Sequence, residues 1–168
     1  NLLITYDPAH SGKAKQEIEN AIKEIKEEIK IVDSKTDGLV EARIKDARKA
    51  VKKLIALCKK DPSKFEVTYH WIPIDKWCKS TVADMQKVIK TFVKDIKENE
   101  KWKMDLSKRQ WDKMPSTELI LKLTEVVNKP KVDLKDPEKI IKVEIIGNKA
   151  GLSLIGADEF LNIPKLKG

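Results

Sequence analysis

The chain has 168 residues, of which 40% are hydrophobic and 37% are charged. This size allows one large domain or two small ones, and the charge content is typical of a globular protein in water. No apolar run approaches the roughly 20 residues that a membrane-spanning helix requires, and no signal-peptide pattern opens the chain. We therefore expect a cytoplasmic protein and not a membrane protein.

The net charge is +8 and is unevenly distributed. Residues 1–75 contain 15 Lys and Arg against 13 Asp and Glu, whereas residues 76–168 contain 20 against 14. A basic surface attracts phosphate-rich partners, so nucleic acid is an expected partner of the second half. Acidic proteins and anionic membranes are the alternatives that charge alone leaves open. The abundance of Lys, Glu and Ile and the scarcity of Gln are typical of a heat-adapted cytosolic protein.

The cysteines and histidines do not indicate a metal site. Cys58 and Cys78 lie far apart in the sequence, and His10 and His70 are not at ligand spacing from them. Both thiols are expected to be free, because disulfides are rare in a reducing cytosol. We expect neither a metal ion nor a cofactor.

The first half alternates short apolar strands with amphipathic helices. In chain order, we expect a strand at residues 2–6, a helix at 11–30, strands at 31–35 and 39–43, a helix at 44–58, and a strand at 65–72. The order β-α-β-β-α-β is that of the ferredoxin-like fold. Residues 1–75 are therefore predicted to form an N-terminal ferredoxin-like domain, which we interpret as a scaffold.

The second half begins a new pattern without a flexible linker. We expect an amphipathic helix at residues 82–96, a strand at 101–109, a helix from residue 116 to near 129, and strands at 139–146 and 150–155. This order, α-β-α-β-β, predicts a second domain at residues 76–168. The whole chain is thus expected to belong to the α+β class.

A candidate binding site lies where the strand at 101–109 leads into the next helix. The strand ends in the basic pair Lys108 and Arg109, and Ser116 precedes an apolar helical pattern. Ser116 can cap the free N–H groups of this helix, and Glu118 in its first turn suits the helix dipole. Two cations beside a helix N-terminus make a site suited to a polyanion.

The second half combines the basic pair Lys108 and Arg109, Ser116-Thr117 opening a helix, Val132-Asp133-Leu134 with Asp136-Pro137, and the strand Val143-Glu144-Ile145. In these features it resembles the THUMP domain, a small α/β RNA-binding module of tRNA-modifying systems that commonly follows a ferredoxin-like unit. With the first half included, the resemblance covers nearly the whole chain.

Within this family, the chain resembles most the stand-alone proteins that act as tRNA-binding adaptors for cytidine acetylation. The resemblance implies a non-catalytic subunit that holds tRNA while a separate acetyltransferase forms 4-acetylcytidine in the D-arm. Only eight residues follow Phe160, so we expect this chain to carry no catalytic domain. The alternative is a tRNA-binding fragment of a longer modification enzyme of the methyltransferase, thiolation or pseudouridine synthase type.

The predicted RNA-binding residues are Lys108, Arg109, Gln110, Trp111, Lys113, Ser116, Thr117 and Lys149. Lys108 and Arg109 are expected to bind phosphate, which positions an RNA without reading its sequence. Trp111 could stack on an unpaired base, whereas Trp102 is expected in the core. No catalytic residues are predicted, because the chain lacks paired catalytic carboxylates, a Cys/His dyad and a Gly-rich cofactor loop.

Overall fold

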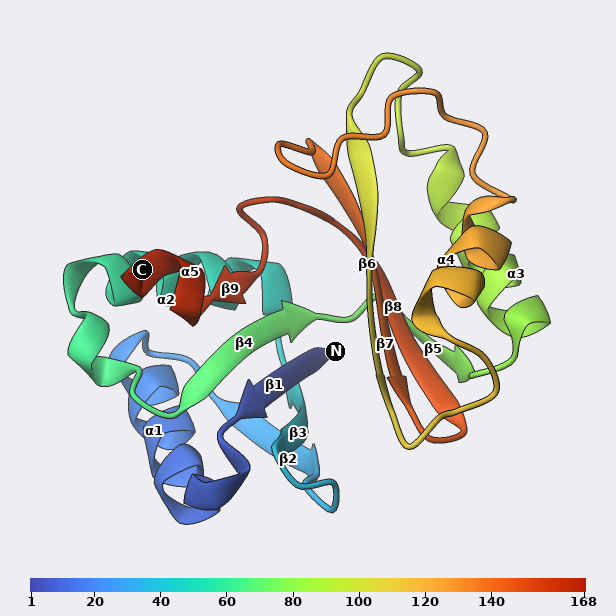
Figure 1. The fold of residues 1–168 in the computed structure, drawn as a ribbon. Coiled ribbons are helices and arrows are strands. Elements are labelled where there is room, and N and C mark those ends of the chain that lie inside the picture. The colour runs from blue at the N-terminus through green and yellow to red at the C-terminus, as the bar shows by residue number, and fades with distance from the viewer. The chain divides into compact units, whose positions relative to one another are not determined.

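A computed structural model describes residues 1–168 and separates the chain into two compact units (Figure 1). Unit 1 comprises Asn1–Ile74 together with Asp158–Gly168, and unit 2 comprises Asp75–Ala157. Each unit contains one β-sheet and its own helices, so the predicted α+β class is confirmed. No helix is both long enough and apolar enough to cross a membrane.

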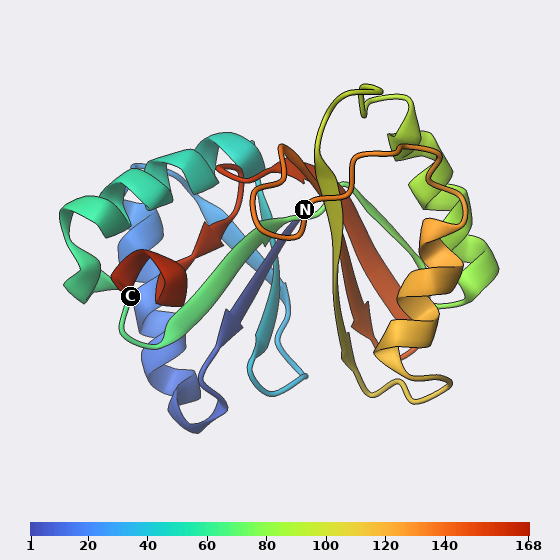
Figure 2. The same ribbon diagram turned by 45° about the horizontal axis from the view of Figure 1, so that its top comes forward.

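Unit 1 has the predicted ferredoxin-like order. Its elements are β1 (Leu2–Tyr6), η1 (Pro8–His10), α1 (Ser11–Glu24), β2 (Ile29–Asp33), β3 (Leu39–Ile44), α2 (Ala47–Lys60), η2 (Pro62–Lys64), β4 (Thr68–Pro73), β9 (Leu161–Asn162) and α5 (Ile163–Lys167). The strands form an antiparallel sheet in the order β2-β3-β1-β4-β9. Helices α1 and α2 cover the same face of this sheet (Figure 2).

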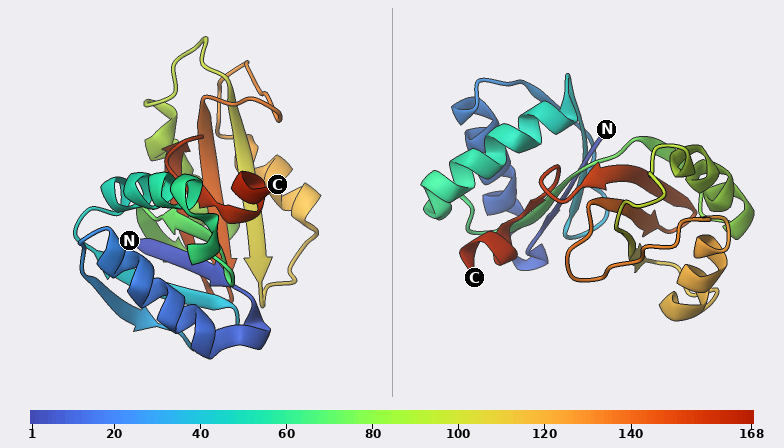
Figure 3. Two further views of the ribbon diagram at one scale, coloured as in Figure 1. Left: turned by 90° about the vertical axis from the view of Figure 1, so that its left-hand side faces the viewer. Right: turned by 90° about the horizontal axis from the view of Figure 1, so that it is seen from above.

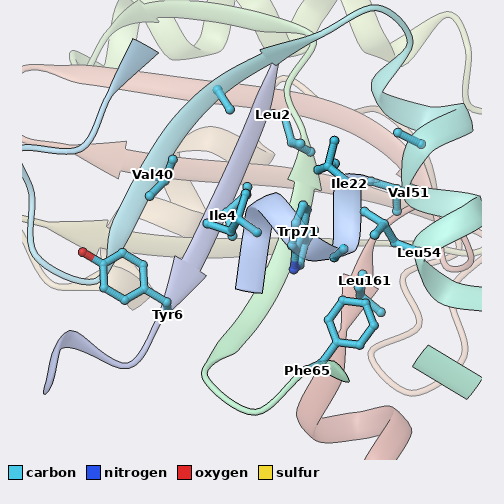
Figure 4. Packing of buried hydrophobic residues seen from close by; sticks show 14 of the residues in the cluster. Leu2, Ile4, Tyr6, Ile22, Val40, Val51, Leu54, Phe65, Trp71 and Leu161 are labelled. Carbon is cyan, nitrogen blue, oxygen red and sulfur yellow. The ribbon is translucent and has the colours of Figure 1, made fainter. Parts of the chain in front are cut away.

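The core of unit 1 lies between this sheet and its two helices (Figure 4). Leu2 and Ile4 alternate along β1 and point toward the helices, because successive strand residues face opposite sides of a sheet. Trp71 on β4 is fully buried, and Phe65 meets its ring edge-on with 6.4 Å between centroids. The Trp71 Nε1–H donates to the Thr68 hydroxyl at 3.1 Å, so the buried indole is satisfied.

Helix α1 is shorter than the helix predicted at residues 11–30. It ends at Glu24, and Lys26 adopts a left-handed conformation with φ of 60°. The Glu27 amide then donates to the Ile22 carbonyl at 3.1 Å, which closes the helix end. The sequence pattern misplaced this boundary because Ile25 and Ile29 fit a helical period equally well, yet Ile29 begins β2.

The last eleven residues belong to unit 1, whereas the sequence assigned them to the second domain. Strand β9 extends the sheet beside β4, with Leu161 opposite Trp71. Leu161 and Ile163 are buried in the unit 1 core. Burial of these two side chains, which chain order does not reveal, places the segment in unit 1.

Unit 2 is a four-stranded sheet covered on one face by two helices (Figure 3). Its elements are β5 (Lys76–Lys79), α3 (Val82–Val93), β6 (Trp102–Arg109), α4 (Ser116–Thr124), β7 (Lys139–Ile146) and β8 (Lys149–Gly156). The strand order is β5-β8-β7-β6, and only the β6–β7 pair is parallel. Strand β5 was not predicted, because four residues at a sheet edge are too few for a recognisable alternation.

The unit 2 core lies under α3 and α4. Met104 on β6 and Ile141, Val143 and Ile145 on β7 belong to this core, and Trp102 joins it as predicted. On β7 the residues between these positions, Lys142 among them, are therefore on the opposite face of the sheet. This second face carries the charged side chains of the candidate site.

Candidate nucleic-acid interface

Three cations stand in one row at the end of the unit 2 sheet. Lys79 on β5 is the register partner of Lys149 on β8. Lys149 is in turn paired with Ile146 on β7, and Ile146 is paired with Arg109 on β6. Register partners lie on the same face of a sheet, with neighbouring strands roughly 4.8 Å apart. We call Lys79, Lys149 and Arg109 the basic row. The sequence predicted two of its members and missed Lys79, because β5 was not recognised.

The pairing of Lys79 with Lys149 places two like charges directly across from each other. Such a pair is unfavourable for the sheet itself. The Lys149 ammonium lies 5.1 Å from the centre of the Trp77 ring on the same face, an arrangement that stabilises the cation. Lys79 is exposed, while Lys149 and Arg109 are partly buried.

The predicted basic pair is divided between the two faces of the sheet. Lys108 points to the face covered by the helices, where its Nζ donates to the Met114 carbonyl at 2.7 Å and lies 5.5 Å from the centre of the Trp111 ring. Arg109 points to the opposite face. Adjacent residues of a strand face opposite sides, so the pair does not form one site as the sequence analysis expected.

Arg109 is paired with a buried carboxylate. Its Nη1 donates to Glu144 Oε2 at 3.1 Å, and Lys142 Nζ lies 3.8 Å from the other oxygen of Glu144. Lys142 also lies 3.7 Å from Asp105, which continues the alternation of charge along the face. Burial raises the pKa of Glu144, while Lys142 and Arg109 act in the opposite direction. These contacts restrain the Arg109 guanidinium.

Trp111 does not present its ring for stacking, in contrast to the expectation from sequence. It is only 9% exposed and belongs to the unit 2 core. Its Nε1–H donates to the Ser80 carbonyl at 3.0 Å, and the Ser80 hydroxyl donates to the Gly147 carbonyl at 2.7 Å. Trp111 thus connects the segment after β6 to the end of β5 and to the β7–β8 turn.

A pocket of about 420 Å³ lies at this junction. Its lining residues are Lys79, Ser80, Thr81, Gln110, Trp111, Asp112, Lys113, Gly147 and Asn148. Gln110 and Gly147 both have left-handed backbones, with φ of 57° and 59°, and the Gly147 amide donates to the Arg109 carbonyl at 2.8 Å. The structure therefore brings the predicted residues Gln110 and Lys113 next to Lys79 of the basic row.

Ser116 and Thr117 form the first turn of α4 and do not line this pocket. The N-cap position is Pro115, and no side chain caps the helix, so Ser116 does not perform the predicted capping role. Side-chain capping occurs instead at α3, where the Asp84 amide donates to the Thr81 hydroxyl at 3.1 Å. Thr81 with Asp84 three residues later was a recognisable helix-start signal that could have indicated the pocket.

A larger groove of about 790 Å³ runs along α1 in unit 1, and its charges are largely balanced. Lys13 lies 3.9 Å from Glu66, and Lys64 lies 3.5 Å from Glu24. The Glu17 carboxylate accepts backbone N–H groups from residues 66, 67 and 68. Paired charges of this kind attract a polyanion less than the like charges of Lys79 and Lys149 do.

Comparisons with known proteins agree with the fold and locate a family in unit 2. Residues 79–155 match the family model of the THUMP domain, and residues 21–66 match that of the ribonuclease HII N-terminal domain. No curated protein matches the chain.

Three similar solved structures are much longer than this chain. PH1313 from Pyrococcus horikoshii Ot3 aligns at 16% identity and a TM-score of 0.60. The alignment covers 92% of this chain and 54% of the PH1313 chain. TrmN from Thermus thermophilus aligns at 16% identity and a TM-score of 0.57, covering 91% and 44%. A predicted N6-adenine-specific DNA methylase from Listeria monocytogenes str. 4b F2365 aligns at 9% identity and a TM-score of 0.58, covering 91% and 39%.

This chain therefore spans about half or less of the length of these structures, and at these identities the likeness extends to the fold alone. The basic pair, the helix opened by Ser116 and the strand around Glu144 all fall within the matched residues. Residues 79–155 of this chain are a THUMP domain.

Proposed function

We propose that the chain is a tRNA-binding module and that the basic row contacts the phosphate backbone. The observation that carries this proposal is the pairing of Lys79 with Lys149 in register at the exposed end of the sheet. Two like charges in this position oppose folding, and phosphate groups bound by the two lysines offset their repulsion. The excess of positive charge in residues 76–168 supports the same partner.

The choice of tRNA rests on the family. The THUMP resemblance implies RNA binding in tRNA-modifying systems, and the family match includes all three residues of the basic row. Phosphate contacts recognise the shape of an RNA and not its sequence, which suits a module that accepts more than one tRNA.

The finer proposal is that the chain has no catalytic activity, lies in the cytoplasm, and presents tRNA to a separate acetyltransferase that forms 4-acetylcytidine in the D-arm. The alternative is a tRNA-binding part of a longer modification enzyme. The greater length of the similar structures favours this alternative. The two differ in one assay: the adaptor increases cytidine acetylation when added in trans to an acetyltransferase, whereas a fragment of another enzyme leaves it unchanged.

Titration of the chain with total tRNA and with a DNA duplex of equal length, over a range of salt, tests the binding proposal. We expect preferential binding of tRNA, with the logarithm of affinity falling linearly with the logarithm of salt concentration. The double variant Lys79→Ala/Lys149→Ala should lower the slope by about 1.4 to 1.8, because each lost phosphate contact removes about 0.7 to 0.9.

The matched control is Lys87→Ala/Lys90→Ala, which removes the same charge from the exposed face of α3 in the same unit. It should change the slope little, because α3 packs on the face of the sheet opposite to the basic row. Equal and weak binding of tRNA and DNA by the wild-type chain contradicts the proposal. Equal effects of the two double variants contradict the choice of surface.

A further inference from the structure

Glu144 is an unusual residue for the middle of a sheet. It lies on β7 between two strands and is only 2% exposed, although it is a carboxylate. An apolar side chain would fill this position at a lower desolvation cost, so packing alone does not explain the charge. Its two oxygens contact two cations, Arg109 Nη1 at 3.1 Å and Lys142 Nζ at 3.8 Å.

The two cations differ in their surroundings. Lys142 is itself buried and lies 3.7 Å from Asp105, so its charge is compensated inside the sheet. Arg109 stands at the strand end in the basic row, and its side chain is 28% exposed. A guanidinium carries five N–H donors in a planar fork, and Glu144 accepts only one of them in this structure.

Glu144 therefore restrains one edge of Arg109 and leaves the rest of the fork for another acceptor. A free arginine side chain samples many rotamers, and ordering it on binding reduces affinity. The free energy lost when a buried ion pair is broken also exceeds the free energy gained from one hydrogen bond to a phosphate. Arg109 therefore does not exchange Glu144 for an RNA phosphate.

We infer that Glu144 is a positioning residue of the RNA interface: it holds the Arg109 guanidinium so that its remaining N–H groups bind an RNA phosphate while the ion pair stays intact. This inference rests on the proposed tRNA-binding function and deepens it. Glu144 does not touch the RNA, and it acts only through Arg109.

The test is a set of tRNA titrations over a range of salt with the whole chain. Arg109→Ala should weaken binding about tenfold and lower the salt slope by about 0.7 to 0.9, since one phosphate contact is lost. Glu144→Gln keeps an oxygen that accepts from Arg109, so it should retain the wild-type affinity and slope. Glu144→Asp keeps the buried charge but withdraws the carboxylate, so it should behave like Arg109→Ala.

The double variant Glu144→Asp/Arg109→Ala should bind no more weakly than Arg109→Ala alone, because both changes remove the same contact. A matched control is Glu98→Gln, which breaks the Glu98–Lys129 ion pair of 3.0 Å elsewhere in unit 2 and should leave binding unchanged. A purely structural role would make the two effects add, or would leave tRNA affinity unchanged in Glu144→Asp, and either result overturns the inference.

Competition between Glu144 and RNA for Arg109 would instead make Glu144→Gln and Glu144→Asp bind more tightly than wild type, which also overturns it. Absence of salt-dependent tRNA binding by the wild-type chain removes the proposed function itself. If the wild-type chain binds tRNA as proposed and Glu144→Asp has the same tRNA affinity, only the role of Glu144 is contradicted. Circular dichroism of each variant ensures that only folded proteins are compared. If Glu144→Asp does not fold, Glu144→Gln still distinguishes positioning from competition, because tighter binding than wild type overturns the inference.

Discussion

Lys108 and Arg109 are consecutive in the chain, yet their side chains lie on opposite faces of the unit 2 sheet. Lys108 donates to the Met114 carbonyl on the helix-covered face, and Arg109 pairs with Glu144 on the other. The first contact organises the segment between β6 and α4, and the second belongs to the basic row. The two residues should therefore respond differently to substitution.

Lys108→Met should destabilise unit 2 by about 1 kcal/mol, because it removes one hydrogen bond and the contact with the Trp111 ring. Chemical denaturation followed by tryptophan fluorescence measures this loss. Lys113→Met, at an exposed position in the same segment, is the control and should leave stability unchanged. If Lys108→Met instead weakens tRNA binding without any loss of stability, Lys108 contacts phosphate as the sequence analysis predicted.

Trp111 should act through packing and its hydrogen bond to Ser80. Trp111→Phe should cost about 1 to 3 kcal/mol, since the Ser80 carbonyl loses its donor. Trp111→Ala should cost roughly 3 to 5 kcal/mol, because the aromatic ring is lost from the core as well. Urea denaturation compares the two variants. A Trp111→Ala protein as stable as wild type, with weakened RNA binding, would restore the stacking role.

Glu17 should stabilise unit 1 through its contacts with the backbone before β4. Its carboxylate accepts the amides of Glu66, Val67 and Thr68 at 2.6, 3.0 and 2.8 Å. Glu17→Ala leaves these donors without a protein partner, and we expect a loss of roughly 2 kcal/mol, measured by thermal denaturation. Glu19→Ala, at an exposed position of the same helix, should change the melting temperature little. Equal effects would mean that water replaces the Glu17 carboxylate fully.

The C-terminal segment should be required for the stability of unit 1. Leu161 is fully buried opposite Trp71, so Leu161→Ala should cost about 2 to 5 kcal/mol. Hydrogen exchange should report faster opening of β1 and β4 while the β6–β7 amides of unit 2 keep their protection. Leu166→Ala, at a side chain that is 40% exposed, is the matched control. Loss of protection in unit 2 alone would contradict the assignment of this segment.

The turn that follows Asp133 should be stabilised by the Asp133 carboxylate in a pH-dependent way. This carboxylate accepts the amides of Asp136 and Lys135, which holds its pKa below the usual value of 3.8. The charged form is therefore favoured by folding, so this contribution is present above pH 3.8 and is lost as the pH falls through the lower, folded-state pKa. The amide NMR shifts of both partners should titrate together below that pH. Asp133→Asn should abolish this titration, and a midpoint above 3.8 would contradict it.

The local patterns of the sequence predicted most elements because each amphipathic period coincides with one buried face. The periods of α2 and α3 and the alternation on β6 and β7 correspond to the cores of the two units. The pattern was ambiguous at Ile25 and Ile29, which fit a helical period although Ile29 begins a strand. It gave no prediction for an element as short as β5. The candidate site depended on β5, so Lys79 could not be found.

The sequence by itself determined the α+β class and the ferredoxin-like order of the first unit, because these follow from periodicity. The resemblance of the second unit to the THUMP domain rested on its local motifs. The tertiary structure alone decided which residues share a face. It placed Lys108 and Arg109 on opposite faces and Lys79 opposite Lys149. It also showed that Trp111 and Glu144 are buried and that residues 158–168 belong to unit 1. The reason is physical: strand pairing and burial join residues that are distant in the chain, and local patterns carry no information about such partners.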